Sequence, residues 1–222
     1  EFVSARGKGL AGSMSVAVIG QGYVGGTLIT ILSERGESVL VYDRIGKRAE
    51  GGVDEFDGSR PGTLAYFVAA CEATENFTGI FFVCVPTPMH RDGTADVTIV
   101  EEVLDGICRS PRRAGAPDRI AVLKSTVPPG SVQRWNARFG AADGGGLHTI
   151  FNPEFLTEAN ALTDMRSQDR VVLGGPRPYI NEVRNLYRRL FPKMAIIKTS
   201  SSTAEMVKYV TNCMLAVKVS FA

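Results

Sequence analysis

Residues 18–26 have the sequence VIGQGYVGG. Its glycines at Gly20, Gly22 and Gly25 follow a short apolar run and lead into a segment that is expected to be helical. In a strand–turn–helix unit, the first such glycine makes the tight turn, the second lets a pyrophosphate approach the backbone, and the third allows close packing of helix on strand. The stretch therefore predicts a dinucleotide-binding turn, with the phosphates at the N-terminus of the helix.

An acidic residue about 20 residues beyond the glycines is expected to bind the ribose hydroxyls of the adenosine. Asp43 stands at that distance, at the end of the next predicted strand. A carboxylate there repels the 2′-phosphate of NADP, so the sequence favours NAD, although Arg44 and Arg48 weaken this distinction. The alternative, glycines that only turn a loop, is disfavoured by the strand, the helix and the acid together.

Short apolar runs alternate with amphipathic segments along the rest of the chain. Strands are expected at 15–19, 38–42, 80–85, 120–124, 149–151, 170–173 and 195–197. Helices are expected at about 24–35, 63–73, 96–109, 130–138, 178–190 and 201–221. Apolar strands separated by helices indicate an α/β fold, a Rossmann-like doubly wound parallel sheet, followed by the start of a long helix.

Composition narrows the class of protein. With 222 residues, 44% apolar and 22% charged, the chain is long enough for a globular domain with a sizeable core. A formal net charge of +2 is not that of a nucleic-acid or anionic-membrane binder. Four cysteines without a CxxC pair or a Cys/His cluster favour reduced thiols in the cytoplasm and no metal site. No apolar run reaches the roughly 18 residues that a bilayer requires.

Three segments are expected along the chain. Residues 1–13 are expected to be a vector-derived leader, with native sequence from Met14. The segment 14–200 is expected to form the cofactor-binding domain, and 201–222 to begin a longer helix. Because that helix stops on an apolar half-turn without a cap, we expect the sequence to be cut there.

Polar motifs follow two predicted strands at their carboxyl ends, where ligands bind in sheets of this class. Val85, Pro86 and Thr87 follow the third strand, and Ser125 and Thr126 follow the fourth, ahead of prolines that set the entry to a helix. Prolines also stiffen loops without any function, so both a structural and a ligand-binding role stay open for these two motifs.

Charged side chains mark two further positions. An Asn-Pro turn at Asn152 places Glu154 at the mouth of a strand, with Glu158 following, although glutamates at this spacing also occur on solvated helix faces. On the last helix, Lys208 and Asn212 are spaced i, i+4 and are expected to share its polar side with Glu205. Alone, such a pair would be an ordinary surface feature.

Six motifs in this order resemble the UDP-glucose/GDP-mannose dehydrogenase family. They are GQGYVG at 20–25, VPTP at 85–88, STVP at 125–128, NPEFL with Glu158 at 152–158, DRVVLG at 169–174 and AEMVKY with Asn212 at 204–212. The resemblance runs from Met14 to the end of the chain. NPEFL and DRVV are more similar to UDP-glucose 6-dehydrogenases than to enzymes of N-acetylated sugars, and GDP-mannose 6-dehydrogenase is the alternative.

The resemblance implies an oxidoreductase of nucleotide-sugar and polysaccharide biosynthesis. Such an enzyme oxidises the C6 alcohol of UDP-glucose twice with two NAD, through a cysteine thiohemiacetal and thioester, to UDP-glucuronate. The resemblance implies a set of residues that line NAD. They are Gly20, Gln21, Gly22, Tyr23, Val24, Gly25, Asp43, Arg48, the run from Val85, Pro86 and Thr87 to Met89, and Ser125, Thr126 and Glu158. It places the sugar against Glu154, Phe155, Leu156, Glu158, Lys208 and Asn212.

Roles follow from that chemistry. Lys208 and Asn212 would hold the oxyanion that forms at C6, and Glu154 would serve as acid and base. Thr126 and Glu158 would position the water that hydrolyses the thioester. The full-length protein is expected to be a homodimer, so an apolar face on the last helix would be left exposed, with the side chains Met206, Val210, Cys213 and Val217.

The sequence departs from the family in two places. The family's cysteine lies in a glycine-rich segment beyond the long helix, and none of Cys71, Cys84, Cys108 and Cys213 matches it; Cys84 is expected inside a strand. The segment 59–64 is shorter than the family's loop and lacks its acid. We therefore expect the cofactor-binding portion of a dehydrogenase, inactive alone.

Two other classes of protein stay open as alternatives. A free-standing, non-catalytic NAD-binding module would have no need of Lys208 and Asn212. Another NAD-linked alcohol dehydrogenase with a helical second domain is disfavoured by the paired Glu154 and Glu158.

Overall fold

The backbone forms one eight-stranded sheet in the order β3-β2-β1-β4-β5-β6-β7-β8. The computed structural model describes residues 12–43, 56–57, 63–140 and 146–221. The strands are Ser15–Ile19 (β1), Ser38–Asp43 (β2), Phe56–Asp57 (β3), Phe77–Val83 (β4), Arg119–Leu123 (β5), Leu147–Phe151 (β6), Arg170–Gly174 (β7) and Ala195–Thr199 (β8). The helices are Tyr23–Glu34 (α1), Thr63–Ala73 (α2), Thr98–Arg109 (α3), Ser131–Phe139 (α4), Ala161–Ser167 (α5), Tyr179–Leu190 (α6) and Ser201–Ser220 (α7), with a 3-10 turn at Glu158–Asn160 (η1).

The sheet is doubly wound. It is parallel from β3 to β6, β7 runs antiparallel to β6, and β8 is parallel to β7. From β1 the chain moves outward to β2 and β3, then returns to pair β4 with the other edge of β1. Strand order therefore reverses between β1 and β4, which is the point where sheets of this class bind ligands, beyond the carboxyl ends of the strands. The predicted fold class is confirmed.

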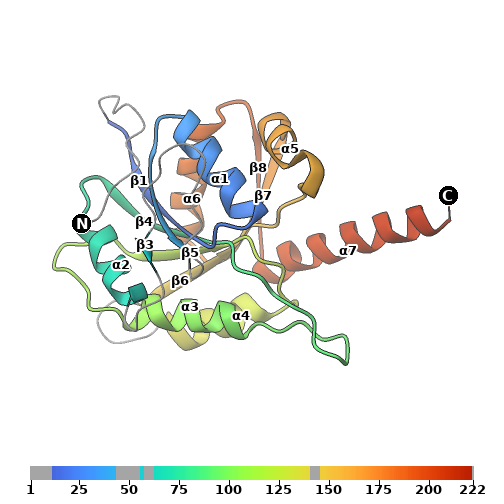
Figure 1. Ribbon diagram of the computed structural model, residues 1–222, viewed down its shortest axis with the longest axis horizontal. Helices are drawn as coiled ribbons and strands as arrows, with labels where there is room; N and C mark the ends of the chain where they lie inside the picture. The colour runs from blue at the N-terminus through green and yellow to red at the C-terminus, as the bar shows by residue number, and fades with distance from the viewer. Residues whose placement is uncertain (1–11, 44–55, 58–62, 141–145, 222) are drawn as a thin grey trace.

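Helices cover both faces of the sheet (Figure 1). Side chains of β1 alternate between two cores: Val16 and Val18 pack with the helices α1, α5 and α6, whereas Ala17 and Ile19 pack with α2, α3 and α4. Burial on both faces explains why the central strands are almost wholly apolar, whereas the edge strand β8 is largely exposed.

Every predicted strand and helix is present within a few residues of its expected bounds. The sequence patterns missed β3, which has only two residues, and α5, a short helix that continues from η1. The described residues do not include Arg48, residues 1–11, residues 59–62 or residues 141–145.

The last helix, α7, is anchored at its start and projects from the domain at its end (Figure 1). Ser200 caps it by accepting a hydrogen bond from the Thr203 amide at 3.1 Å. Its second half exposes the expected apolar face: Val210 is 52% and Val217 50% exposed, and Cys213 is exposed too. In the described part of the chain, no helix is long and apolar enough to cross a membrane.

Candidate cofactor and active site

The glycine turn after β1 has the geometry that its spacing predicts. Gly20 has φ +92°, and a Cβ there would lie 2.7 Å from the carbonyl oxygen of Cys84. At Gly25 a Cβ would lie 1.9 Å from the carbonyl oxygen of Gly20, so only glycine lets α1 approach the turn this closely. A Cβ at Gly22 would meet nothing within 4 Å. The first and third glycines are thus required by packing, and the second borders open space.

The N-terminus of α1 faces that open space. Gly22 is its N-cap and provides no side-chain hydrogen bond, and the first turn carries no acidic residue. The first amide groups of a helix lack intrahelical acceptors and carry the positive end of its dipole. This helix end is therefore suited to a phosphate.

Asp43 lies at the end of β2, beside the turn. Its Oδ2 accepts a hydrogen bond from the Gln21 amide at 2.6 Å, and the Gly20 amide donates to the Tyr42 carbonyl at 2.8 Å. Next to this carboxylate is a cavity of about 360 Å³, which we call the Asp43 cavity; it is lined by Ile19, Gly20, Tyr42, Asp43, Leu64, Val85, Pro86, Ile99, Glu102 and Val103. A ring system could bind between its apolar walls while Asp43 meets a sugar at its edge.

A second cavity, of about 230 Å³, lies on the other side of the turn. This glycine-turn cavity is lined by Gly22, Tyr23, Val24, Cys84, Val85, Pro86, Thr87, Lys124, Ser125, Thr126 and Glu154. The Ser125 hydroxyl donates to the Val85 carbonyl at 2.6 Å and so joins the carboxyl ends of β5 and β4. The structure thus brings both proline-containing motifs to the glycine turn, while Met89 lies further out and is 76% exposed.

An ion pair between Glu154 and Lys208 closes one side of the glycine-turn cavity. The Lys208 ammonium donates to Glu154 Oε1 at 2.9 Å and to the Glu154 carbonyl at 2.6 Å. Both residues are buried, and Oε2 accepts a hydrogen bond from the Leu156 amide at 2.8 Å. The ammonium also lies 5.7 Å from the ring centroid of Phe155. Glu154 is held at the mouth of β6, as predicted.

Glu205 and Lys208 share one side of α7, the side that packs against the domain. Both are buried against the domain. Glu205 accepts hydrogen bonds from the amides of Gly130 at 2.6 Å and Val132 at 2.9 Å, which caps the N-terminus of α4. The charges turn inward because the domain supplies a partner for each of them.

Glu158 and Asn212 do not join the Glu154–Lys208 pair. Glu158 begins η1 and is exposed, and Asn212 is exposed on the projecting part of α7. The Tyr23 phenol lies near both glutamates: burial raises its pKa most, and the Glu154 and Glu158 carboxylates raise it further. Two expected substrate residues, Glu158 and Asn212, are therefore open to solvent, and neither lines the glycine-turn cavity.

Lys124 is a site residue that the sequence reading missed. It directly follows β5, is 5% exposed, and lines the glycine-turn cavity. Its ammonium donates to Asn152 Oδ1 at 3.2 Å, and the Tyr187 hydroxyl donates to the same oxygen. Burial lowers the pKa of Lys124 to about 8, and Lys208 acts in the same direction. A lysine directly after an apolar strand, at the ligand-binding edge, was the signal in the sequence.

Cys84 lies just beyond β4, not within the strand, and its side chain packs beside the glycine turn. Burial raises the pKa of this thiol to about 12, so it is not a thiolate near neutral pH. Cys213 is exposed on α7, and all four cysteines are free. Within the described ranges, no group of three His, Cys, Asp or Glu side chains could hold a metal ion.

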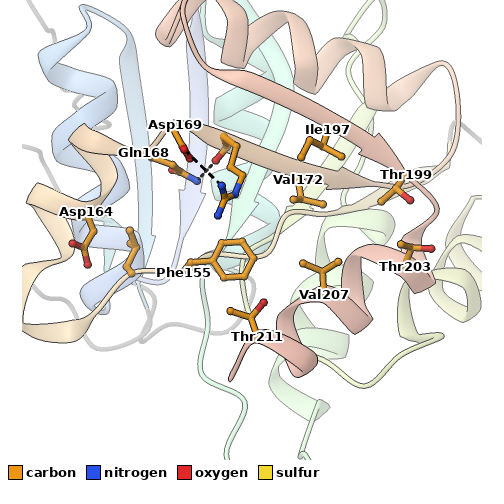
Figure 2. A pocket seen from close by; sticks show the side chains of 12 residues that line it. Phe155, Asp164, Gln168, Asp169, Val172, Ile197, Thr199, Thr203, Val207 and Thr211 are labelled. Atoms are coloured by element: carbon orange, nitrogen blue, oxygen red, sulfur yellow. Dashed lines mark hydrogen bonds and ion pairs between the residues drawn. The ribbon is translucent and has the colours of Figure 1, made fainter. Parts of the chain in front are cut away.

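A larger groove, of about 450 Å³, runs between β7, β8 and α7 (Figure 2). Phe155 stands at its centre in Figure 2, with Ile197 of β8 and Val207 of α7 across from it. Of the residues expected to meet a sugar, Phe155 and Leu156 line this groove, whereas Glu154 lines the glycine-turn cavity. The segment 154–156 therefore lies between the two spaces.

Comparisons with known proteins point to one family. The sequence model described as "UDP-glucose/GDP-mannose dehydrogenase family, NAD binding domain" matches residues 62–191. UDP-glucose 6-dehydrogenase YwqF of Bacillus subtilis is 31% identical over 228 residues, which cover 94% of this chain and 49% of the relative. UDP-glucose 6-dehydrogenase of Rickettsia prowazekii is 30% identical over 223 residues, covering 94% and 50%. The chain spans about half the length of the curated relatives it matches.

Solved structures agree with this assignment. A UDP-glucose dehydrogenase of Pyrobaculum islandicum is similar with a TM-score of 0.69 and 27% identity, over 95% of this chain and 52% of that one. A ternary complex of GDP-mannose dehydrogenase from Pseudomonas aeruginosa has a TM-score of 0.69 and 26% identity, over 94% and 51%. The likeness of backbone does not distinguish between the two sugar nucleotides.

Proposed function

Because the chain belongs to the UDP-glucose/GDP-mannose dehydrogenase family, we propose that it is the NAD-binding portion of a UDP-glucose 6-dehydrogenase. The observation that carries this proposal is the buried Glu154–Lys208 ion pair beside the glycine-turn cavity. A domain that only binds NAD has no need of an acid and an ammonium at that place. UDP-glucose is favoured by the names of the relatives, and GDP-mannose is the second candidate because the backbone of its dehydrogenase is equally similar.

The residues present fit NAD. The adenine and its ribose would occupy the Asp43 cavity, with the Asp43 carboxylate on the ribose hydroxyls. The pyrophosphate would lie where Gly22 leaves open space at the N-terminus of α1, and the nicotinamide would enter the glycine-turn cavity. The walls of that cavity would be Val85, Pro86, Thr87, Ser125 and Thr126, and the exposed Glu158, which lies near Tyr23, would approach the cofactor from solvent. Arg48 lies outside the described residues. Bound NAD would supply the hydride acceptor.

The protein's own groups would handle the proton and the charge. When hydride leaves the sugar C6, the Glu154 carboxylate would take the hydroxyl proton, and the Lys208 ammonium would stabilise the negative oxygen. Lys208 is already oriented by its two hydrogen bonds to Glu154. Thr126 and Glu158 would hold the water for thioester hydrolysis, and Asn212 would add an amide donor once the sugar is bound.

The nucleophilic cysteine is not assigned within this sequence. Cys84 is buried with a raised pKa, and the exposed Cys213 lies on α7, away from the cavity walls. A thiolate would come from another part of a longer protein, and this portion alone would be inactive.

We place the cofactor domain at 14–200 and take 201–222 as the start of a connecting helix, through which a cytoplasmic homodimer would form. The exposed apolar side chains of α7 support that role.

The function is tested by assaying the longer protein that contains this sequence. With UDP-glucose and NAD⁺, we expect two NADH per sugar oxidised, measured by absorbance, and much less with GDP-mannose. A reversed preference would transfer the assignment to GDP-mannose. If neither sugar nucleotide yields NADH while NAD⁺ still binds, the account of a non-catalytic NAD-binding module replaces this one.

A further inference from the structure

Lys124 is a buried ammonium with donors left over. A lysine ammonium has three hydrogens to donate. In the described part of the chain its one hydrogen-bond acceptor is Asn152 Oδ1, at 3.2 Å. The Asn152 side chain has hydrogen-bond partners other than Lys124. The Tyr187 hydroxyl donates to the same oxygen, and the Asn152 side-chain amide donates to the Val172 carbonyl at 3.0 Å. Burying a charge with few hydrogen-bond partners costs free energy. The position of Lys124 at a cavity wall therefore indicates that its ammonium acts on a ligand in the cavity.

The charges around Lys124 leave one positive charge unmatched. Glu154 beyond β6 and Lys208 on α7 both act on it electrostatically. Lys208 contacts the Glu154 carboxylate directly and neutralises it. The other buried titratable groups that face the site are neutral: Cys84 beyond β4, Tyr187 on α6 and Tyr23 on α1 have raised pKa values. The Glu158 carboxylate also acts on Tyr23, but it is exposed to solvent and does not line the cavity. With Lys124 protonated, the buried groups around the glycine-turn cavity therefore carry a surplus positive charge.

We propose that the Lys124 ammonium makes the glycine-turn cavity bind the reduced, uncharged nicotinamide ring in preference to the oxidised, positively charged ring. This inference rests on the proposed function, which places the nicotinamide in that cavity. Like charges repel strongly where water is largely excluded. The ring loses its positive charge when it accepts a hydride, so Lys124 favours bound NADH over bound NAD⁺. The equilibrium on the protein therefore shifts toward the oxidised sugar and NADH.

The preference depends on pH in a defined direction. The pKa of Lys124 is lowered to about 8, chiefly by burial. Below that value the lysine is charged and the preference for NADH is present; as pH rises above it, the lysine becomes neutral and the preference disappears. The nicotinamide and the neutral tyrosines do not titrate over this range, so the loss is specific to Lys124.

Binding measurements on the chain itself test the inference without catalysis. Calorimetric titration at pH 7 gives the ratio of the NAD⁺ and NADH dissociation constants. Lys124→Met removes the charge and keeps the length of the side chain, and Lys124→Gln also keeps a donor for Asn152. In both variants we expect the ratio to fall about tenfold. Lys193→Met, which removes an exposed lysine outside the glycine-turn cavity, is the matched control and should leave the ratio unchanged.

A pH series on the wild-type chain gives a second test that needs no variant. The ratio should fall between pH 7 and pH 9 in the wild type and stay flat in Lys124→Gln. If Lys124 only supports Asn152, its variants weaken both cofactors equally and leave the ratio as it was, which overturns the inference while NAD binding stands. If the wild type binds neither cofactor, the proposed function fails and this inference falls with it.

Discussion

Two buried basic side chains stand at opposite ends of β5 and are treated differently by the protein. Arg119, at the start of the strand, donates to Glu72 Oε1 at 2.6 Å and to the carbonyls of Ile107 at 2.7 Å, Ser110 at 2.8 Å and Pro111 at 3.0 Å. Lys124, directly after the strand, donates to Asn152 alone among the described residues. The protein itself satisfies the first charge, whereas the second faces a cavity.

A structural charge and a functional charge thus differ in where they lie and in how fully the protein pairs them. Arg119 joins β5 to α2 and to the carbonyls at the end of α3, so it fixes the edge of the sheet away from the ligands. Lys124 and the Glu154–Lys208 pair lie at the carboxyl edge, where the strand ends open into a cavity. Burial alone would class Arg119 and Lys124 together; the number of satisfied donors separates these two side chains.

The largest expected effect comes from removing the structural charge. Arg119→Met leaves Glu72 buried without its partner, so the free energy of unfolding should fall by about 3–5 kcal/mol. Urea unfolding followed by circular dichroism measures this change. The double variant with Glu72→Leu should recover much of the loss, since no lone charge is left. A loss below about 1 kcal/mol would mean that the two ends of β5 do not differ as described.

The next effect concerns catalysis. Lys208→Ala in the longer protein should lower kcat by about a hundredfold, because the ammonium that stabilises the oxyanion is lost. The NAD⁺ dissociation constant should change much less, since Lys208 contacts Glu154 and not the glycine turn. Steady-state kinetics and NAD⁺ titration measure the two quantities. Equal losses in both would contradict the assignment of Lys208 to the sugar side.

A smaller effect is expected at the cofactor. Asp43→Ala should weaken NAD⁺ binding by about tenfold, through the loss of hydrogen bonds to the ribose. Because Asp43 also accepts a hydrogen bond from the Gln21 amide, Asp43→Asn is the matched variant that keeps an acceptor there. Calorimetric titration compares the three proteins. Unchanged NAD⁺ affinity in the alanine variant would show that the glycine fingerprint has been misassigned.

The smallest effect at neutral pH is expected for the stability of Lys124→Met. An apolar side chain of similar size should keep the free energy of unfolding within about 1 kcal/mol at pH 7. The folded-state pKa of Lys124, about 8, is below its usual 10.5, so the unfolded chain holds more protons between these values. Wild-type stability should then rise with pH from about 8 to 10.5, relative to the variant. Parallel stability curves over that range, from urea unfolding at each pH, would contradict the burial of this charge.

Much of this site could be predicted because its signals are local. The β1 strand, the glycine turn, α1 and Asp43 follow from spacing within one stretch of sequence, and the motifs after β4, β5 and β6 follow from the rule that ligands bind at carboxyl ends. The short β3 and α5 could not be found, since elements of that length carry too few residues for a periodic pattern.

The contacts that hold the site residues depend on partners far away in sequence. The Lys208 side chain points into the domain, where its ammonium donates to Glu154. The Glu205 side chain does the same, and its carboxylate accepts from the amides of Gly130 and Val132. The spacing of polar residues along α7 contains no information on either partner. For Lys124, the sequence gives its place at the end of a strand but not the number of acceptors around it.

The most direct test of the central claim is a calorimetric titration of the wild-type chain with NAD⁺ and, separately, with NADP⁺. We expect saturable binding of one NAD⁺ and much weaker binding of NADP⁺, because the Asp43 carboxylate at the end of β2 repels a 2′-phosphate. Absence of NAD⁺ binding, or equal affinity for the two cofactors, would contradict the placement of the adenosine beside Asp43.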